Sequence, residues 1–164
     1  MGQIRIDPFN ESNLSPNSYD FTLGDTLRIY DELELDAAKE NSSHTVGIGP
    51  DGYLLRPDRI YLGSTVEVIG SGTYVPIIRG RSSTARLGLF VHVTADLIDL
   101  GSFGQLTLQL RAVVPLRVYA GWTIGQVTFW RTLGERTMYA GKYQGSVGPQ
   151  ASKSHMDPMF RRLT

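Results

Sequence analysis

Apolar and polar residues alternate in many short stretches of this chain, most clearly over residues 105–114. Every second position from 106 to 110 is leucine, so the leucines are predicted to face a core, while Thr107, Gln109 and Arg111 face the other side. Further strand-like runs, separated by turn residues, are 3–6, 19–23, 27–35, 53–55, 59–68, 74–78, 89–93, 116–119 and 123–130. This pattern predicts an all-β fold: a distorted β-barrel or jelly roll of short antiparallel strands.

Helical patterns are few, and we expect one or two short helices. Residues 36–43 (DAAKENSS) form the best candidate, and a second helix is predicted to begin near residues 84–87, capped by a serine hydroxyl. Residues 47–52 have the spacing G-x-G-x-x-G, but Pro50-Asp51-Gly52 is typical of a turn and an extended run follows. A dinucleotide site needs a helix there, so we interpret this segment as a turn.

The length of 164 residues predicts one domain over 1–148, which includes a polar, glycine-rich arm from about residue 136. We expect the tail, 149–164, to be disordered or packed on a neighbouring subunit. The arm lacks apolar periodicity and is predicted to be mobile enough to close over a ligand.

Composition excludes several classes of function. The 16 basic and 16 acidic residues balance to a net charge of +0, which argues against a nucleic-acid partner. Without cysteine the chain has no thiol nucleophile and no zinc-deaminase motif. No run is long and apolar enough for a membrane span or a signal peptide, so we expect a cytoplasmic protein, in the host cytoplasm if it is virus-encoded.

Residues 80–86 (GRSSTAR) concentrate groups that bind a polyanion: two arginines, three hydroxyls and a glycine. If a helix starts here, its N-terminal N–H groups also point at the anion. A surface turn with paired arginines is the alternative. Asp20 is expected either to hold one of these arginines or simply to end a strand.

Several motifs resemble those of dCTP deaminases, the relatives of trimeric dUTPases. They are GRSSTARLGLFVHVTA with the ID of Ile98-Asp99, SYD with LG at 18–24, AGWTIGQ at 120–126 and KYQG at 142–145. The resemblance implies a homotrimer with sites between subunits, a nucleotide substrate (dUTP or dCTP), and Mg²⁺ bound through the phosphates. It implies phosphate contacts from Arg81, Ser82, Ser83, Arg86, Lys142 and Tyr139, and base or sugar contacts from Thr94, Ala95, Thr107, Leu108, Gln109 and Phe103.

One departure from the family pattern changes the expected chemistry. Gln109 stands where dCTP deaminases carry the glutamate that shuttles protons during deamination. An amide has no titratable proton, so Gln109 cannot act as a general acid or base. Asp99, which the resemblance assigns to water activation in dUTPases, is present. We therefore expect a dUTP diphosphatase that forms dUMP and diphosphate, with Asp99 as its catalytic residue.

Three alternatives stay open. The chain is a dCTP deaminase, or a bifunctional deaminase-dUTPase, in which Gln109 replaces the glutamate; or a dCTP-preferring diphosphatase; or a nucleotide-binding regulator without catalysis. The resemblance also leaves a second role open for Asp99, because in dCTP deaminases this Asp contacts the deoxyribose, and Asp99 could do only that. The second Asp and the Arg of the dUTPase motif are missing after Asp99, and Ser146 stands where deaminases have glutamine. His92, in an apolar run, is interpreted as structural.

Overall fold

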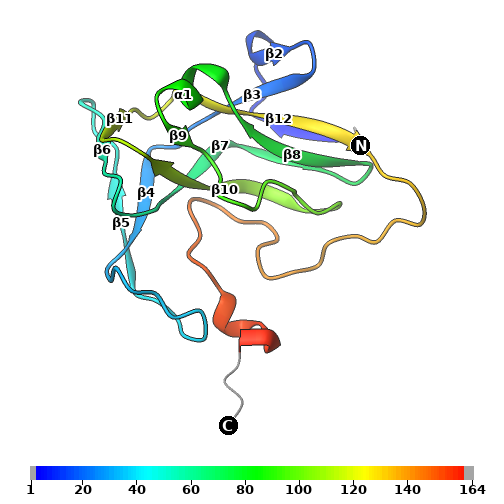
Figure 1. The fold of residues 1–164 in the computed structure, drawn as a ribbon. Coiled ribbons are helices and arrows are strands. Elements are labelled where there is room, and N and C mark those ends of the chain that lie inside the picture. The colour runs from blue at the N-terminus through cyan, green and yellow to red at the C-terminus, as the bar shows by residue number, and fades with distance from the viewer. Residues whose placement is uncertain (1–2, 161–164) are drawn as a thin grey trace.

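The computed structural model describes residues 3–160, which form antiparallel β-sheets with little helix (Figure 1). No helix within that range is long and apolar enough to cross a bilayer. The helical elements are α1 (Ser82–Arg86) and the single 3₁₀ turns η1 (Glu11–Asn13), η2 (Ser154–Met156) and η3 (Pro158–Phe160). The strands are β1 (Ile4–Asp7), β2 (Leu14–Ser15), β3 (Ser18–Thr22), β4 (Thr26–Tyr30), β5 (Ser43–Gly47), β6 (Tyr53–Leu55), β7 (Tyr61–Ser71), β8 (Tyr74–Gly80), β9 (Leu89–Phe90), β10 (Phe103–Ala112), β11 (Leu116–Val118) and β12 (Thr123–Arg131).

The strands form two main sheets. One has the order β5-β4-β7-β10-β9, with β1 also paired to β7, and the other has the order β2-β3-β12-β8. A small β6-β11 ribbon completes the described part of the chain. The predicted all-β, antiparallel fold is confirmed, and over residues 3–160 it takes the form of packed sheets that do not close into a barrel.

The core lies between these sheets, and β10 contributes its leucine face to it. Leu108 and Leu110 are 0% exposed and Leu106 is 7% exposed, whereas Thr107 and Gln109 are half-buried on the opposite face. The predicted alternation along β10 is therefore confirmed. Because the leucine side is fixed in the core, the polar face is held in one orientation.

The predicted helix at residues 36–43 is wrong. Asp36 Oδ1 accepts a hydrogen bond from the Ala38 N–H at 2.9 Å, and Asn41 Nδ2 donates to the Asp36 carbonyl at 2.9 Å. These side chains satisfy the backbone in a turn and so compete with helical hydrogen bonds. The strand β5 then begins at Ser43, where the sequence pattern gave no signal.

Other boundaries also differ from the prediction. The predicted strand 89–93 shrinks to β9 because the chain then leaves β10 and bonds to β8, where Ile78 N donates to the Asp96 carbonyl at 2.8 Å. The predicted strand 27–35 ends at Tyr30. Beyond it, Asp31 accepts a hydrogen bond from Ser42 and pairs with His44 Nδ1 at 2.5 Å, and both contacts hold the pKa of Asp31 below its ordinary value.

Candidate functional site

Arg81 lies between β8 and α1 and is held from two sides. Its Nη2 lies 3.1 Å from Asp20 Oδ2, and its Nη1 donates to the hydroxyl and, at 3.3 Å, to the carbonyl of Thr123. The side chain of Asp20 is 13% exposed and that of Arg81 is 35% exposed, so this contact is partly shielded from water. The interpretation that Asp20 holds an arginine of this segment is confirmed, and the guanidinium is fixed rather than free to swing.

The other predicted phosphate-binding side chains of this segment lie on α1, directly after Arg81. Ser82 and Ser83 are exposed on the first turn of α1, where backbone N–H groups have no intrahelical partner. Arg86 Nη1 donates to the Ser82 carbonyl at 3.2 Å. The predicted serine cap is wrong: Arg81 is the N-cap residue, without a side-chain cap, and the buried Thr84 hydroxyl instead donates to the Arg81 carbonyl at 3.0 Å. The segment thus presents cations, hydroxyls and N–H donors together.

Asp99 lies in a groove of about 620 Å³ between the loop that precedes β10 and the start of the arm. Tyr139 lines the same groove, and its N–H donates to the Leu100 carbonyl at 2.7 Å. The Asp99 carboxylate is exposed and has no hydrogen-bond or ion-pair partner among residues 3–160. It is therefore available to a ligand or to water.

The loop that carries Asp99 is tied to the edge of β8. Ile98 N donates to the Pro76 carbonyl at 2.9 Å, and Asp96 forms an ion pair with Arg79. Thr94 and Ala95, predicted base or sugar contacts, lie exposed on the same loop. These contacts fix the position of Asp99 along β8.

An open stretch of backbone runs along β10 at Thr107 and Gln109. Gln105 N–H donates away from β7, to the Ser146 carbonyl at 2.8 Å, so every second residue directs its backbone groups outward. Arg111, two positions past Gln109, pairs with Phe90 of β9. Between these two partners, the outward N–H groups of Thr107 and Gln109 have no backbone partner in the described chain. A planar base could bind to such an edge.

The Gln109 side chain borders this open edge. Its Nε2 donates to the Thr107 carbonyl at 3.1 Å, whereas its Oε1 is inaccessible to water and has no partner in the described chain. A carbonyl can only accept, so the contact orients the amide and leaves Oε1 as a spare acceptor. Phe103, at the other end of β10, packs over Gly70, where an added Cβ would lie 2.5 Å from its ring.

The arm is seated on its own chain along β10. Gly148 N donates to Gln105 Oε1 at 2.6 Å, and Gln150 N donates to Thr107 Oγ1 at 3.1 Å. Lys142, a predicted phosphate contact, forms an ion pair with Asp157. In this chain the predicted phosphate contact Lys142 therefore already has a protein partner.

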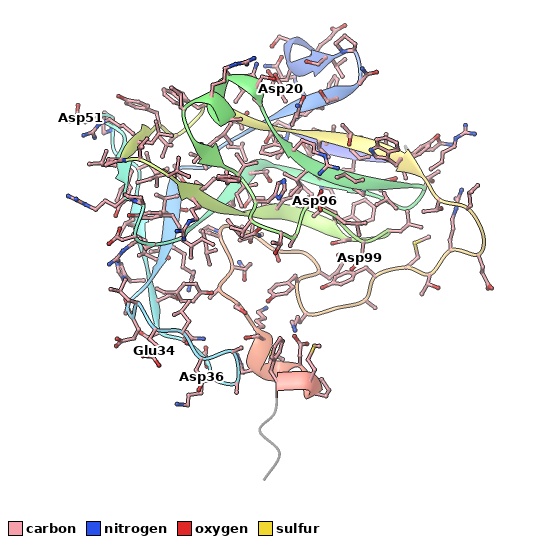
Figure 2. The ribbon with its side chains drawn as sticks, viewed as in Figure 1. Asp20, Glu34, Asp36, Asp51, Asp96 and Asp99 are labelled. Carbon is pink, nitrogen blue, oxygen red and sulfur yellow. The ribbon has the colours of Figure 1, made fainter. Side chains whose placement is uncertain are left out.

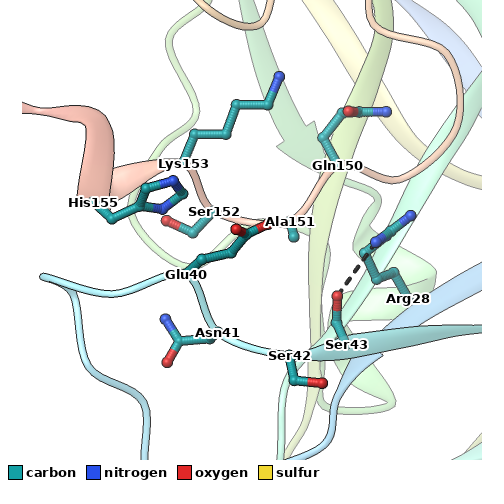
Figure 3. Close-up of a pocket in the computed structure, with 10 residues that line it drawn as sticks. All are labelled: Arg28, Glu40, Asn41, Ser42, Ser43, Gln150, Ala151, Ser152, Lys153 and His155. Carbon is teal, nitrogen blue, oxygen red and sulfur yellow. Dashed lines mark hydrogen bonds between the residues drawn. The ribbon is translucent and has the colours of Figure 1, made fainter.

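The tail continues from the arm across β4. A groove of about 530 Å³ separates residues 150–155 from residues 40–43 (Figure 3). Arg28 lies at one end of it, where Nε donates to the Pro149 carbonyl at 3.1 Å and Nη1 donates to Ser43 at 3.3 Å. Residues 149–160 thus pack on their own chain here, while 161–164 lie outside the described residues. Packing of the tail on a neighbouring subunit stays a prediction.

The predicted site residues form two groups at opposite ends of β8. Asp99 follows the loop segment that bonds to Pro76, whereas Arg81 follows the other end of the strand at Gly80. Figure 2 shows Asp20, the partner of Arg81, and Asp99 on different sides of the fold. Val75, which lines the same groove as Asp99, lies six positions before Arg81, which corresponds to roughly 20 Å of extended chain. A triphosphate chain is much shorter than this distance.

Sequence reasoning missed Glu67, a charged residue in the middle of the apolar strand β7. It is 3% exposed, and its carboxylate accepts the Thr22 N–H. A lone acidic residue among apolar ones in a buried strand was a signal that could have been noticed. Sequence reasoning also missed Thr123 and Gln126; the latter's Nε2 donates to the Gly80 carbonyl at 3.1 Å.

Within residues 3–160, no three His, Asp or Glu side chains lie close enough together to hold a metal ion by themselves. The resemblance implies Mg²⁺ carried by the nucleotide phosphates. The free carboxylate of Asp99 suits that arrangement, since phosphate-bound Mg²⁺ needs few protein ligands and keeps several waters.

Comparisons with known proteins agree with the fold and with the motifs. A family model described as dCTP deaminase-like matches residues 1–132. The chain is 43% identical over 155 residues to the "dCTP deaminase, dUMP-forming" of Leptospira biflexa, which covers 94% of this chain and 89% of that protein. It is 44% identical over 155 residues to the protein of the same name from Cytophaga hutchinsonii, and this match covers 94% of this chain and 90% of that protein.

The fold also resembles a solved structure, that of 2′-deoxycytidine 5′-triphosphate deaminase from Agrobacterium tumefaciens. The TM-score is 0.61 at 21% identity, and the match covers 77% of this chain and 43% of that one. Fold and sequence together define an enzyme of nucleotide metabolism. The chain belongs to the dCTP deaminase-like family.

Proposed function

We propose that this protein is a deoxynucleoside triphosphate diphosphatase that converts dUTP and water into dUMP and diphosphate. The observation that carries the proposal is the amide of Gln109. Its nitrogen is bound to the Thr107 carbonyl and its oxygen has no proton to give, so it cannot carry protons to or from a base. The free carboxylate of Asp99 supports the remaining chemistry, which is hydrolysis.

The proposed reaction needs one proton acceptor. Asp99 takes a proton from a water molecule while the water oxygen forms a bond to the α-phosphorus and the bond from that phosphorus to the diphosphate oxygen breaks. Arg81, Arg86 and the N–H groups of α1 hold the β- and γ-phosphates, where the leaving charge develops. Mg²⁺ bound to the phosphates would neutralise part of that charge.

We propose further that the site forms between copies of the chain in a homotrimer. Asp99 and Arg81 are too far apart along β8 to bind the same triphosphate within one chain, so Arg81 of one copy must meet Asp99 of another. Mixing two inactive variants, Arg81→Ala and Asp99→Asn, should then restore part of the activity, because some mixed sites carry both native residues. Full inactivity of the refolded mixture would contradict a shared site.

A second candidate is dCTP deamination that ends at dUMP, and the names of the curated relatives favour it. That conversion removes both the amino group of the base and diphosphate. This chain supplies a carboxylate for the second part and an amide where the first part needs a proton carrier. If Gln109 is the only obstacle, Gln109→Glu should release ammonia from dCTP; a revertant that releases none would exclude this candidate.

The proposal is tested by initial rates of diphosphate release from dUTP and from each of the four standard deoxynucleoside triphosphates, with Mg²⁺ present. We expect dUTP to be the preferred substrate. Equal rates for purine and pyrimidine nucleotides would argue against base reading at Thr107 and Gln109. Tight binding without turnover of any nucleotide would replace the proposal by a regulatory role.

A further inference from the structure

We propose that Glu67 is a positioning residue for Arg81, acting through the backbone of β3. Glu67 lies on β7 and is 3% exposed. Its two carboxylate oxygens lie 2.9 and 3.2 Å from the N–H of Thr22. No Lys, Arg or His within residues 3–160 forms an ion pair with it. A buried polar side chain is costly unless it is hydrogen-bonded, so the contact with Thr22 offsets the burial of Glu67.

Thr22 needs this acceptor because its N–H points away from β12. The neighbouring Leu23 N donates to the Trp122 carbonyl at 2.8 Å, on the β12 side, and successive N–H groups of a strand point in opposite directions. On the other side, β2 pairs only with Ser18 and Tyr19 of β3, so no strand of the described chain meets Thr22 there. A backbone N–H without a strand partner needs another acceptor, and the Glu67 carboxylate supplies it.

The Thr22 backbone lies between both groups that hold Arg81. Thr22 pairs directly with Thr123, which accepts hydrogen bonds from Arg81. Asp20, two residues before Thr22 and therefore on the same face of β3, accepts from the other side of the guanidinium. Fixing Thr22 thus fixes the relative position of the carboxylate and the hydroxyl that orient Arg81.

A carboxylate serves this position better than an amide. Both of its oxygens can accept from the single N–H, whereas glutamine presents one oxygen and adds an NH₂ group that would need acceptors in a buried site. Glu67→Gln therefore weakens the contact while keeping the shape of the side chain. Because it lies on β7, away from the phosphate segment, it leaves every proposed substrate contact intact.

The inference rests on the proposed triphosphate contact of Arg81, so its test combines kinetics with measurements that need no turnover. In Glu67→Gln we expect the KM for dUTP to rise about fivefold while kcat stays within about twofold, the result of losing uniform binding. We also expect faster hydrogen exchange of the Thr22 N–H and a changed ¹⁵N shift of the Arg81 side chain. Glu67→Ala should show larger changes in the same direction.

Two controls separate positioning from general loosening. Glu34→Gln, on an exposed loop, should change none of these values. Ile69→Val removes a methyl group from a fully buried residue of the same strand and should lower stability without raising KM. The inference is overturned if Ile69→Val raises KM as much as Glu67→Gln, or if the Thr22 exchange and the Arg81 shift are unchanged in Glu67→Gln. If the native chain binds no triphosphate, the proposed function fails, while the Thr22 and Arg81 measurements still decide the positioning role.

Discussion

Replacing Asp99 by asparagine is the sharpest single change to the proposed chemistry. The substitution keeps the shape of the side chain, removes its charge and its ability to accept a proton, and replaces one oxygen by an NH₂ donor. The Asp99 carboxylate is exposed and holds no other described residue, while the backbone contact from Ser102 N to the Asp99 carbonyl, at 3.0 Å, is unaffected. The variant should therefore fold as the native chain does.

The expected magnitudes differ widely between stability and activity. An exposed substitution of this kind changes the free energy of unfolding by at most about 0.5 kcal/mol. Loss of a positioned general base lowers the rate by about 10²–10⁴-fold, which corresponds to roughly 3–5 kcal/mol on the activation barrier. A large loss of kcat with an unchanged unfolding curve is thus the signature of a chemical role.

The assay measures steady-state diphosphate release from dUTP together with urea unfolding. Asp96→Asn is the matched control, because Asp96 lies on the same loop but pairs with Arg79. We expect the control to keep activity within about tenfold, through slight loosening of the loop. The reasoning is refuted if Asp99→Asn keeps more than half of the native kcat, or if both variants lose activity equally.

Three further predictions concern stability and pH. Gln109→Glu turns an oxygen toward the Thr107 carbonyl and should lower the free energy of unfolding by about 1–3 kcal/mol at neutral pH. Because this repulsion raises the pKa of the new carboxyl group, that group protonates as the pH falls, and the difference from the native chain in urea titrations should shrink. Leu108→Ala should lower the free energy of unfolding by about 2–5 kcal/mol in urea melts, since the side chain is fully buried; a loss below about 1 kcal/mol would contradict the core assignment. The pKa of Asp31 is lowered mainly by the Ser42 hydrogen bond. At pH values well above the ordinary pKa of 3.8, the native protein should therefore be more stable than Asp31→Asn. This difference in the free energy of unfolding should vanish as the pH falls through the lowered pKa.

The sequence predicted those parts of the fold that depend on short-range patterns. The alternation at 106–110 predicted which side of β10 faces the core, because a strand repeats every two residues. The sequence failed at residues 36–43, where side chains that bond to their own backbone resemble a helix start by composition. It also could not predict β5, whose residues form a strand only because β4 lies beside them.

The candidate site also has parts that the sequence could predict and parts that it could not. The residues at 81–86 are contiguous, so their proximity could be read directly from the sequence, and the Asp20 contact was one of two open interpretations. The separation of Asp99 from Arg81 along β8 depends on which strand edge the loop at 96–98 joins. Long-range hydrogen bonds decide that edge, and no local pattern encodes them. Glu67 is visible in the sequence as a lone acidic residue in an apolar run, but its contact with Thr22 joins residues 45 positions apart and could not be predicted from that run.

The central claim is that hydrolysis survives in this chain and deamination does not. The most direct measurement incubates the native protein with dCTP and with dUTP, in separate tubes containing Mg²⁺, and identifies the nucleotide products and ammonia. We predict dUMP and diphosphate from dUTP, and no ammonia and no uracil nucleotide from dCTP. Formation of dUMP or dUTP from dCTP, with an equal amount of ammonia, would contradict it.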